Sequence, residues 1–136
     1  MNVFTALTPK MMTMYMDPKT TIRQALEKFD AHKFSAVPIV DGKGNYITTI
    51  SEGDILRFIK KNNYFDLRQA EKTLVIDIEH YRPYKSLSQT GTEKEMLELI
   101  LLQNFIPIVD DRGKYIGIVK RKDIMRLLID SKKESE

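Results

Sequence analysis

The sequence predicts a mixed α/β (α+β) fold built from two copies of one small unit, each in the order β-α-β-β-α. A ten-residue stretch, PIVDGKGNYI from Pro38, returns as PIVDDRGKYI from Pro107. The similarity continues without a gap at an offset of 69 residues, so that 10 of the 22 positions from Pro38 to Ile59 match those from Pro107 to Leu128. Helical spacing flanks the stretch in both copies. An internal duplication explains all three observations.

The first copy contains a predicted helix, a hairpin and a second helix. Thr20 or Thr21 can cap the first helix, and its apolar residues from Ile22 to Phe29 fall at i, i+3, i+4 and i+7. AVPIV then reads as a buried strand, DGKGN as a glycine-containing turn and YITTI as the returning strand. The second helix is predicted over residues 52–61.

The second copy repeats these elements in the same order. Thr92 opens a helix, FIPIV and YIGIV form a hairpin through DDRGK, and a last helix is predicted over residues 121–130. An extended segment precedes each first helix, MTMYM in one copy and YKSLS in the other. We expect each of these segments to complete the small sheet of its copy.

The predicted domain organisation is a first repeat at residues 7–62, a connector at 63–83, a second repeat core at 84–130 and a flexible tail at 131–136. The second repeat can also begin near residue 74, where LVIDI predicts a short ordered piece in the connector. Because roughly 60 residues bury only a marginal core, we expect the repeats to pack about a pseudo-twofold axis as one compact unit.

Composition excludes several classes of function. The 136 residues include no cysteine, which rules out disulfides and thiolate chemistry and fits a cytoplasmic protein. No leader-like N-terminus and no apolar run of about 18 residues are present, so we expect no membrane association. A net charge of +3 is too small to indicate nucleic acid as a partner.

Catalytic motifs are missing from the sequence. The two histidines have no metal-ligand spacing, and neither a P-loop nor a G-x-S-x-G motif occurs. We therefore predict a protein that is not an enzyme and that needs no metal or cofactor.

The duplicated pattern resembles a tandem pair of CBS (cystathionine-β-synthase) domains, or Bateman module. SAVPIVD leading to ITTISEGDIL, and NFIPIVD leading to IGIVKRKDIM, carry the resemblance, which extends from about Leu7 to Ile129. It implies a stand-alone regulatory module that binds AMP, ADP, ATP, S-adenosylmethionine or cyclic di-AMP in clefts between the repeats. It also implies a homodimer that signals to a separate protein target.

The resemblance places the ligand signature where strand and helix meet. The signature is SEGD, from Ser51 to Asp54, in the first copy and KRKD, from Lys120 to Asp123, in the second. The two oxygens of such an aspartate can accept hydrogen bonds from both hydroxyls of a ribose. Lys120 departs from the family pattern, which has serine or threonine there, and Asp54 therefore ranks as the better nucleoside candidate.

Further ligand contacts follow from the same resemblance. Backbone groups at the strand edges would contact the adenine base, and the candidates are Ser35, Ala36, Val37, Phe105 and Ile106. Cationic side chains would contact phosphate, and the candidates are Lys120 and Arg121.

Two alternatives stay open. Ser51 and Asp54 also fit a capping box, which needs no ligand. The chain would then be a ligand-free dimerisation scaffold. A nucleic-acid binder would use KRKDIMR and the lysines at 60 and 61, but this basic run lacks interleaved aromatic residues.

Overall fold

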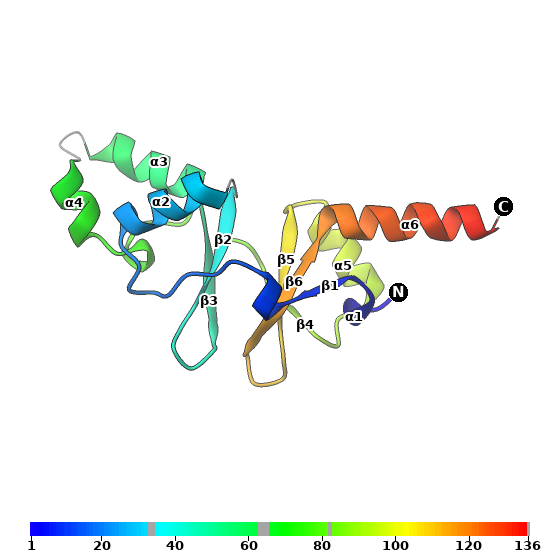
Figure 1. The fold of residues 1–136 in the computed structure, drawn as a ribbon. Coiled ribbons are helices and arrows are strands. Elements are labelled where there is room, and N and C mark those ends of the chain that lie inside the picture. Colours follow the sequence, from blue (N-terminus) through cyan, green and yellow to red (C-terminus); the bar gives the residue numbers. More distant parts are fainter. Residues whose placement is uncertain (33–34, 63–65, 82, 136) are drawn as a thin grey trace. The chain divides into compact units, whose positions relative to one another are not determined.

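A computed structural model describes residues 1–32, 35–62, 66–81 and 83–135 (Figure 1). The chain divides into two compact units. The first-repeat unit is Met14–Pro83, and the second-repeat unit combines Met1–Thr13 with Tyr84–Glu136. The mixed α+β class and the duplicated order of elements are as the sequence predicts.

The first-repeat unit is an antiparallel hairpin covered by helices. Its elements are α2 (Ile22–His32), β2 (Ala36–Val40), β3 (Tyr46–Ser51), α3 (Glu52–Lys61), α4 (Leu67–Lys72) and the 3₁₀ turn η2 (Val75–Asp77). Met16 forms a parallel bridge with Ile39, which confirms that MTMYM joins this sheet. The connector contains two ordered pieces, α4 and η2. The sequence predicts one of them, because η2 lies within LVIDI.

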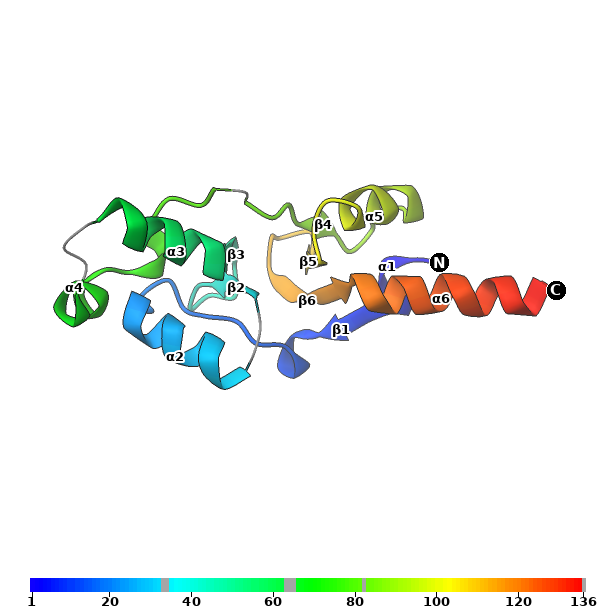
Figure 2. The ribbon, with the colours of Figure 1, turned by 90° about the horizontal axis from the view of Figure 1, so that it is seen from above.

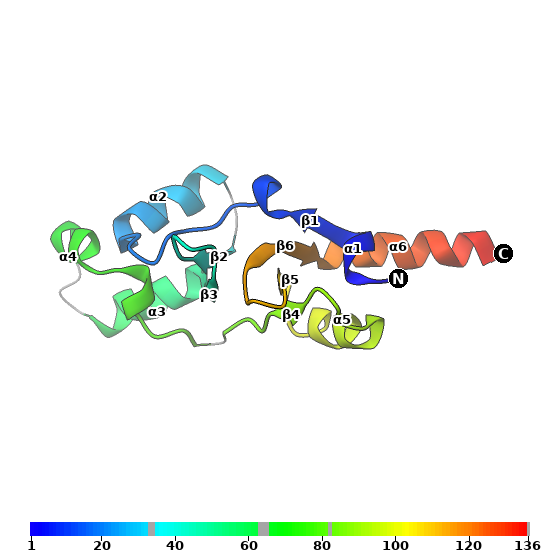
Figure 3. The same ribbon diagram turned by 90° about the horizontal axis from the view of Figure 1, so that it is seen from below.

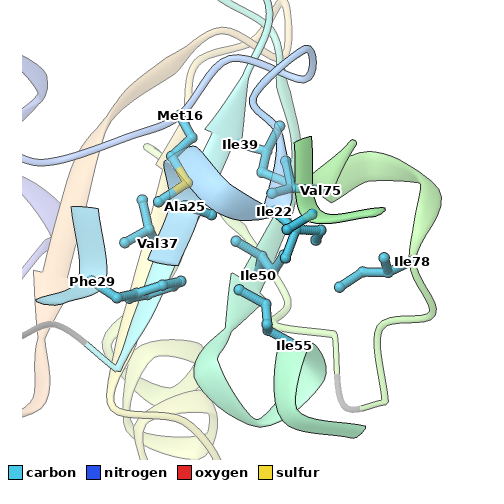
Figure 4. Close-up of a cluster of buried hydrophobic side chains, with 11 residues drawn as sticks. Met16, Ile22, Ala25, Phe29, Val37, Ile39, Ile50, Ile55, Val75 and Ile78 are labelled. Carbon is cyan, nitrogen blue, oxygen red and sulfur yellow. The ribbon is translucent and has the colours of Figure 1, made fainter. Parts of the chain in front are cut away.

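The core of this unit gathers apolar side chains from every one of its elements (Figure 4). The predicted stripe on α2 is buried at Ile22, Ala25 and Phe29, whereas Leu26 at position i+4 is exposed, so the helical spacing is confirmed at three of its four positions. The remaining buried members are Met16, Val37, Ile39, Ile50, Ile55, Ala70, Val75 and Ile78. The connector therefore completes the core of the first repeat.

The second-repeat unit contains a sheet in the order β1-β6-β5-β4. Its elements are α1 (Val3–Ala6), β1 (Leu7–Pro9), the 3₁₀ turn η1 (Lys10–Met12), β4 (Leu87–Ser88), α5 (Glu93–Ile100), β5 (Phe105–Val109), β6 (Tyr115–Lys120) and α6 (Arg121–Ser135). β4 pairs with β5, which confirms that YKSLS joins this sheet, and the pairing is parallel. Thr92 caps α5, as predicted. The unit has its own buried core, which includes Val3 and Ala6 from the N-terminus.

The N-terminal strand β1 pairs with β6 of the second repeat, an arrangement that the sequence does not predict. Leu7, Thr8 and Pro9 lie opposite Val119, Ile118 and Gly117. A Cβ at Gly117 would lie 2.1 Å from the carbonyl oxygen of Thr8, and φ there is +150°. Only glycine lets the two backbones approach this closely.

The last helix continues past its predicted end near Asp130, because α6 reaches Ser135. Most of the segment predicted as a flexible tail is thus helical. Among the described residues, no helix has the length and apolar character needed to cross a membrane.

Candidate functional site

Both repeats place the start of their last helix beside the first residues of a strand. In the first repeat, Ala36 lies opposite Ser51, and the amide of Glu52 donates to the carbonyl of Ser35 at 2.9 Å. Asp54 follows one turn later on α3. The structure therefore brings together the candidates that the sequence named around the SEGD motif, apart from Val37, which points into the core (Figure 4).

Ser51 and Asp54 form a capping box at the start of α3. The amide of Asp54 donates to Ser51 Oγ at 3.1 Å, and the amide of Ser51 donates to Asp54 Oδ2 at 2.9 Å. This confirms the geometry expected of a helix cap. One oxygen of the Asp54 carboxylate is thus used by the helix itself.

The other oxygen of Asp54 is used by the connector. The amide of Tyr81 donates to Asp54 Oδ1 at 3.0 Å, and Nη1 of Arg57 lies 3.6 Å from the same oxygen. The Arg57 guanidinium also lies over the Tyr81 ring, 4.2 Å from its centroid. Asp54 is only 4% exposed as a result. A ribose could reach this carboxylate only by displacing Tyr81 and its amide.

A small hollow next to this arrangement measures about 30 Å³, which is large enough for water but not for a nucleoside. Arg57, Phe58, Lys61, Glu79 and Tyr81 line it. Lys61 Nζ donates to Glu79 Oε2 at 2.8 Å, and this hydrogen bond with the lysine charge lowers the pKa of Glu79. The first-repeat pocket is therefore largely closed and its charges are paired.

The equivalent position of the second repeat is open. Lys120 precedes α6 where Ser51 precedes α3, and a lysine side chain has no atom that accepts a hydrogen bond. Asp123 is partly exposed, and within the part of the chain that the structure describes its carboxylate has no hydrogen bond or ion pair. It faces a cavity of about 280 Å³.

This second-repeat pocket lies between α6 on one side and α1 with β1 on the other. Figures 2 and 3 show the N-terminal segment running beside α6. The lining residues are Thr5, Ala6, Leu7 and Thr8 from the N-terminus and Asp123, Arg126, Leu127 and Asp130 from α6. At the repeat offset of 69, the four α6 residues correspond to Asp54, Arg57, Phe58 and Lys61. Three of these equivalents, Arg57, Phe58 and Lys61, line the first-repeat hollow, so the two pockets lie on corresponding faces of α3 and α6, with little space in the first repeat and more in the second.

The remaining predicted contacts of the second repeat lie outside this pocket. The Arg121 guanidinium donates to the carbonyl of Ile100 at 2.9 Å and to Asn104 Oδ1 at 3.0 Å, so it holds the end of α5. The Phe105 ring packs on Tyr84, and Ile106 is buried in the core. Lys120 is not among the lining residues.

Sequence reasoning missed Arg126, Asp130 and the N-terminal wall. Helical spacing could have found the first two, because positions i, i+3 and i+7 from Asp123 share one face of a helix. The wall from Thr5 to Thr8 carries no comparable signal, since it depends on the long-range pairing of β1 with β6. Among the described residues, no group of acidic and histidine side chains could hold a metal ion.

Comparison with known proteins identifies the family. The family model of the CBS domain matches residues 9–61 and 76–130. The chain therefore belongs to the CBS domain family and carries two copies of the domain.

A relative from Methanocaldococcus jannaschii, itself described as uncharacterized, is 28% identical over 138 residues. The alignment covers 93% of this chain but only 49% of that protein, so the chain spans about half of its relative.

Two solved structures share the fold and hold adenosine-containing ligands. CbpB in complex with c-di-AMP is 21% identical, with a TM-score of 0.84 over 98% of this chain and 91% of that chain. CBSX2 in complex with AMP is 22% identical, with a TM-score of 0.75 over 96% of this chain and 98% of that chain. CBSX2 is a protein of Arabidopsis thaliana. At this level of identity, the likeness shows the fold alone.

Proposed function

We propose that this chain is a regulatory module that binds an adenosine-containing ligand in the second-repeat pocket and signals to a protein partner. The observation that carries the proposal is the Asp123 carboxylate, which is unpaired among the described residues and faces the open cavity. The ligands of CbpB and CBSX2, c-di-AMP and AMP, support the ligand class. AMP, ADP, ATP, S-adenosylmethionine and cyclic di-AMP are the ligands to compare.

The pocket offers the groups that a nucleoside monophosphate needs. The two oxygens of Asp123 can accept hydrogen bonds from the 2′ and 3′ hydroxyls of a ribose, and such bonds to a charged group are strong. Arg126, one turn later, can pair with a phosphate. Ala6, Leu7 and Leu127 add apolar surface, which is typical of small-molecule sites.

The contacts favour Asp123 over Asp54 as the nucleoside ligand, although the sequence ranked Asp54 first. Each oxygen of Asp54 accepts a backbone amide, from Ser51 or Tyr81, and the side chain is buried, whereas Asp123 has no such donors among the described residues. We therefore propose the second-repeat pocket as the primary site. Ser35, Ala36, Ser51 and Asp54 stay candidates for a weaker second site that opens only if Tyr81 moves away.

We further propose a homodimer formed through the last helix of each repeat. Leu56 on α3 and Met125 on α6 are equivalent at the repeat offset, and both are about half exposed, at 53% and 51%. Leu128 and Ile129 add to the apolar face of α6. Light scattering on the wild-type chain and an Ile129→Glu variant tests this, because the variant should be monomeric.

A thermal-shift panel with the five ligands named above tests the proposed function. A ligand at 100 times its Kd stabilises the folded state by about 2.7 kcal/mol, so at least one of the five should raise the melting temperature of the wild-type chain. The same ligand should leave the melting temperature of Asp123→Asn nearly unchanged. No shift with any of the five would leave the ligand-free scaffold as the better account.

A further inference from the structure

The two equivalent pockets differ in charge at one helical position. The first-repeat pocket has Lys61 where the second-repeat pocket has Asp130, seven residues after the respective aspartates. The open pocket therefore contains two carboxylates and one guanidinium, from Asp123, Asp130 and Arg126. Within the described part of the chain, none of these three side chains has a hydrogen-bonding or ionic partner.

The spacing along α6 assigns each charge to a different part of a ligand. With a rise of about 1.5 Å per residue, Arg126 lies about 4.5 Å and Asp130 about 10 Å along the helix axis from Asp123. A ribose held at Asp123 by its diol carries its 5′ carbon on another edge of the ring. Because the pocket extends along α6 from Asp123 to Asp130, the 5′ substituent has room in that direction.

We propose that Asp130 determines which adenosine-containing ligands the pocket accepts. This inference rests on the proposed function. Arg126 pairs with a first phosphate, so AMP is accepted, whereas the added phosphates of ADP and ATP come close to the Asp130 carboxylate and are repelled. A neutral or cationic 5′ substituent, such as the methionine group of S-adenosylmethionine, meets no such repulsion. The expected order of affinity is AMP and S-adenosylmethionine first, then ADP, then ATP.

Calorimetric titrations of AMP and ATP into wild-type chain and Asp130→Lys test this assignment. Lysine is the residue that the first repeat has at this position, so the helix accommodates either charge. Magnesium-free buffer of low ionic strength keeps the phosphate charge defined and the screening weak. Glu98→Lys is the control, because Glu98 is an exposed residue of α5 in the same unit and the change alters net charge equally.

The ratio of ATP affinity to AMP affinity is the readout. Asp130→Lys should raise this ratio by about tenfold or more, and Glu98→Lys should leave it within about twofold of the wild-type value. An unchanged ratio in Asp130→Lys, with AMP still bound, would overturn the role of Asp130 and leave the proposed function intact. Failure of the wild-type chain to bind AMP and ATP would overturn the role of Asp130, and failure to bind any of the five ligands would overturn the proposed function as well.

Discussion

Asp54 and Asp123 occupy the same position of their helices, yet their carboxylates have different surroundings. Asp54 accepts hydrogen bonds from the amides of Ser51 and Tyr81 and is buried. Removal of a buried acceptor leaves its donors unpaired, which costs more than the net value of the hydrogen bond itself. Asp123 has no such donors among the described residues. These surroundings support a structural role for the first aspartate and the binding role that we propose for the second.

Asp54→Ala should lower the free energy of unfolding by roughly 1 to 3 kcal/mol, because the amides of Ser51 and Tyr81 lose their acceptor. Asp123→Ala should cost less than about 1 kcal/mol, the typical value of a carboxylate near a helix N-terminus. Urea denaturation of both variants measures the difference. Equal losses of stability would contradict the different roles assigned here.

At the scale of single elements, the short strand β1 has the largest consequence for the site. It forms the edge of the second-repeat sheet, and its residues Leu7 and Thr8 also line the pocket. Its pairing with β6 depends on Gly117, where any side chain would meet the Thr8 carbonyl. The first repeat has Thr48 at the equivalent position, and there the hydroxyl lies 3.3 Å from Nδ1 of His80 in the connector.

Gly117→Ala should detach β1 and weaken ligand binding together, because one strand serves both the sheet and the pocket. We expect a loss of unfolding free energy of roughly 1 to 3 kcal/mol, from the close contact and the positive φ. Hydrogen exchange at Ile118, whose backbone lies opposite Thr8 in β1, and a titration with AMP measure the two effects. Gly42→Ala is the control, because a Cβ there has no neighbour within 4 Å.

If Gly117→Ala binds AMP as tightly as the wild-type chain while exchange at Ile118 rises, β1 is not a wall of the binding site. The pocket would then have to be assigned to other residues of α6.

The helices and hairpins follow from local sequence, whereas the site depends on contacts between distant residues. Spacing, turn glycines and capping threonines are local signals, and they predicted α2, α5 and both hairpins. β1 is three residues long and ends in proline, so it has no readable periodicity. The Tyr81 amide that engages Asp54 lies 27 residues away along the chain. No pattern in the sequence predicts that contact. Because of it, we rank Asp123 above Asp54 as the candidate ligand contact, the reverse of the ranking from sequence.

At the scale of the whole molecule, each compact unit contains segments that a simple division into repeats would cut away. The first-repeat core includes Ala70, Val75 and Ile78 from the connector. The second-repeat core includes Val3 and Ala6 from the N-terminus. A division of the chain between the two helix-hairpin-helix patterns therefore removes part of both cores.

A fragment that ends at Asn63 should be unfolded or aggregated, because it lacks the connector residues of its core. A fragment of residues 14–83 keeps the whole cluster and is the matched comparison, so it should give better dispersed amide signals. Two-dimensional NMR of both fragments measures this. A well-dispersed spectrum from the fragment ending at Asn63 would show that the connector is not needed for the first-repeat core.

The most direct test of the account is a calorimetric titration of AMP into the wild-type chain and into Asp123→Asn. We predict one AMP per chain for the wild type, because the first-repeat pocket is closed by Tyr81. The affinity of Asp123→Asn for AMP should be roughly a hundredfold lower, because the variant loses charge-assisted hydrogen bonds to the ribose. Two equivalent AMP sites per chain, or unchanged affinity in Asp123→Asn, would contradict the central claim that the second-repeat pocket is the ligand site.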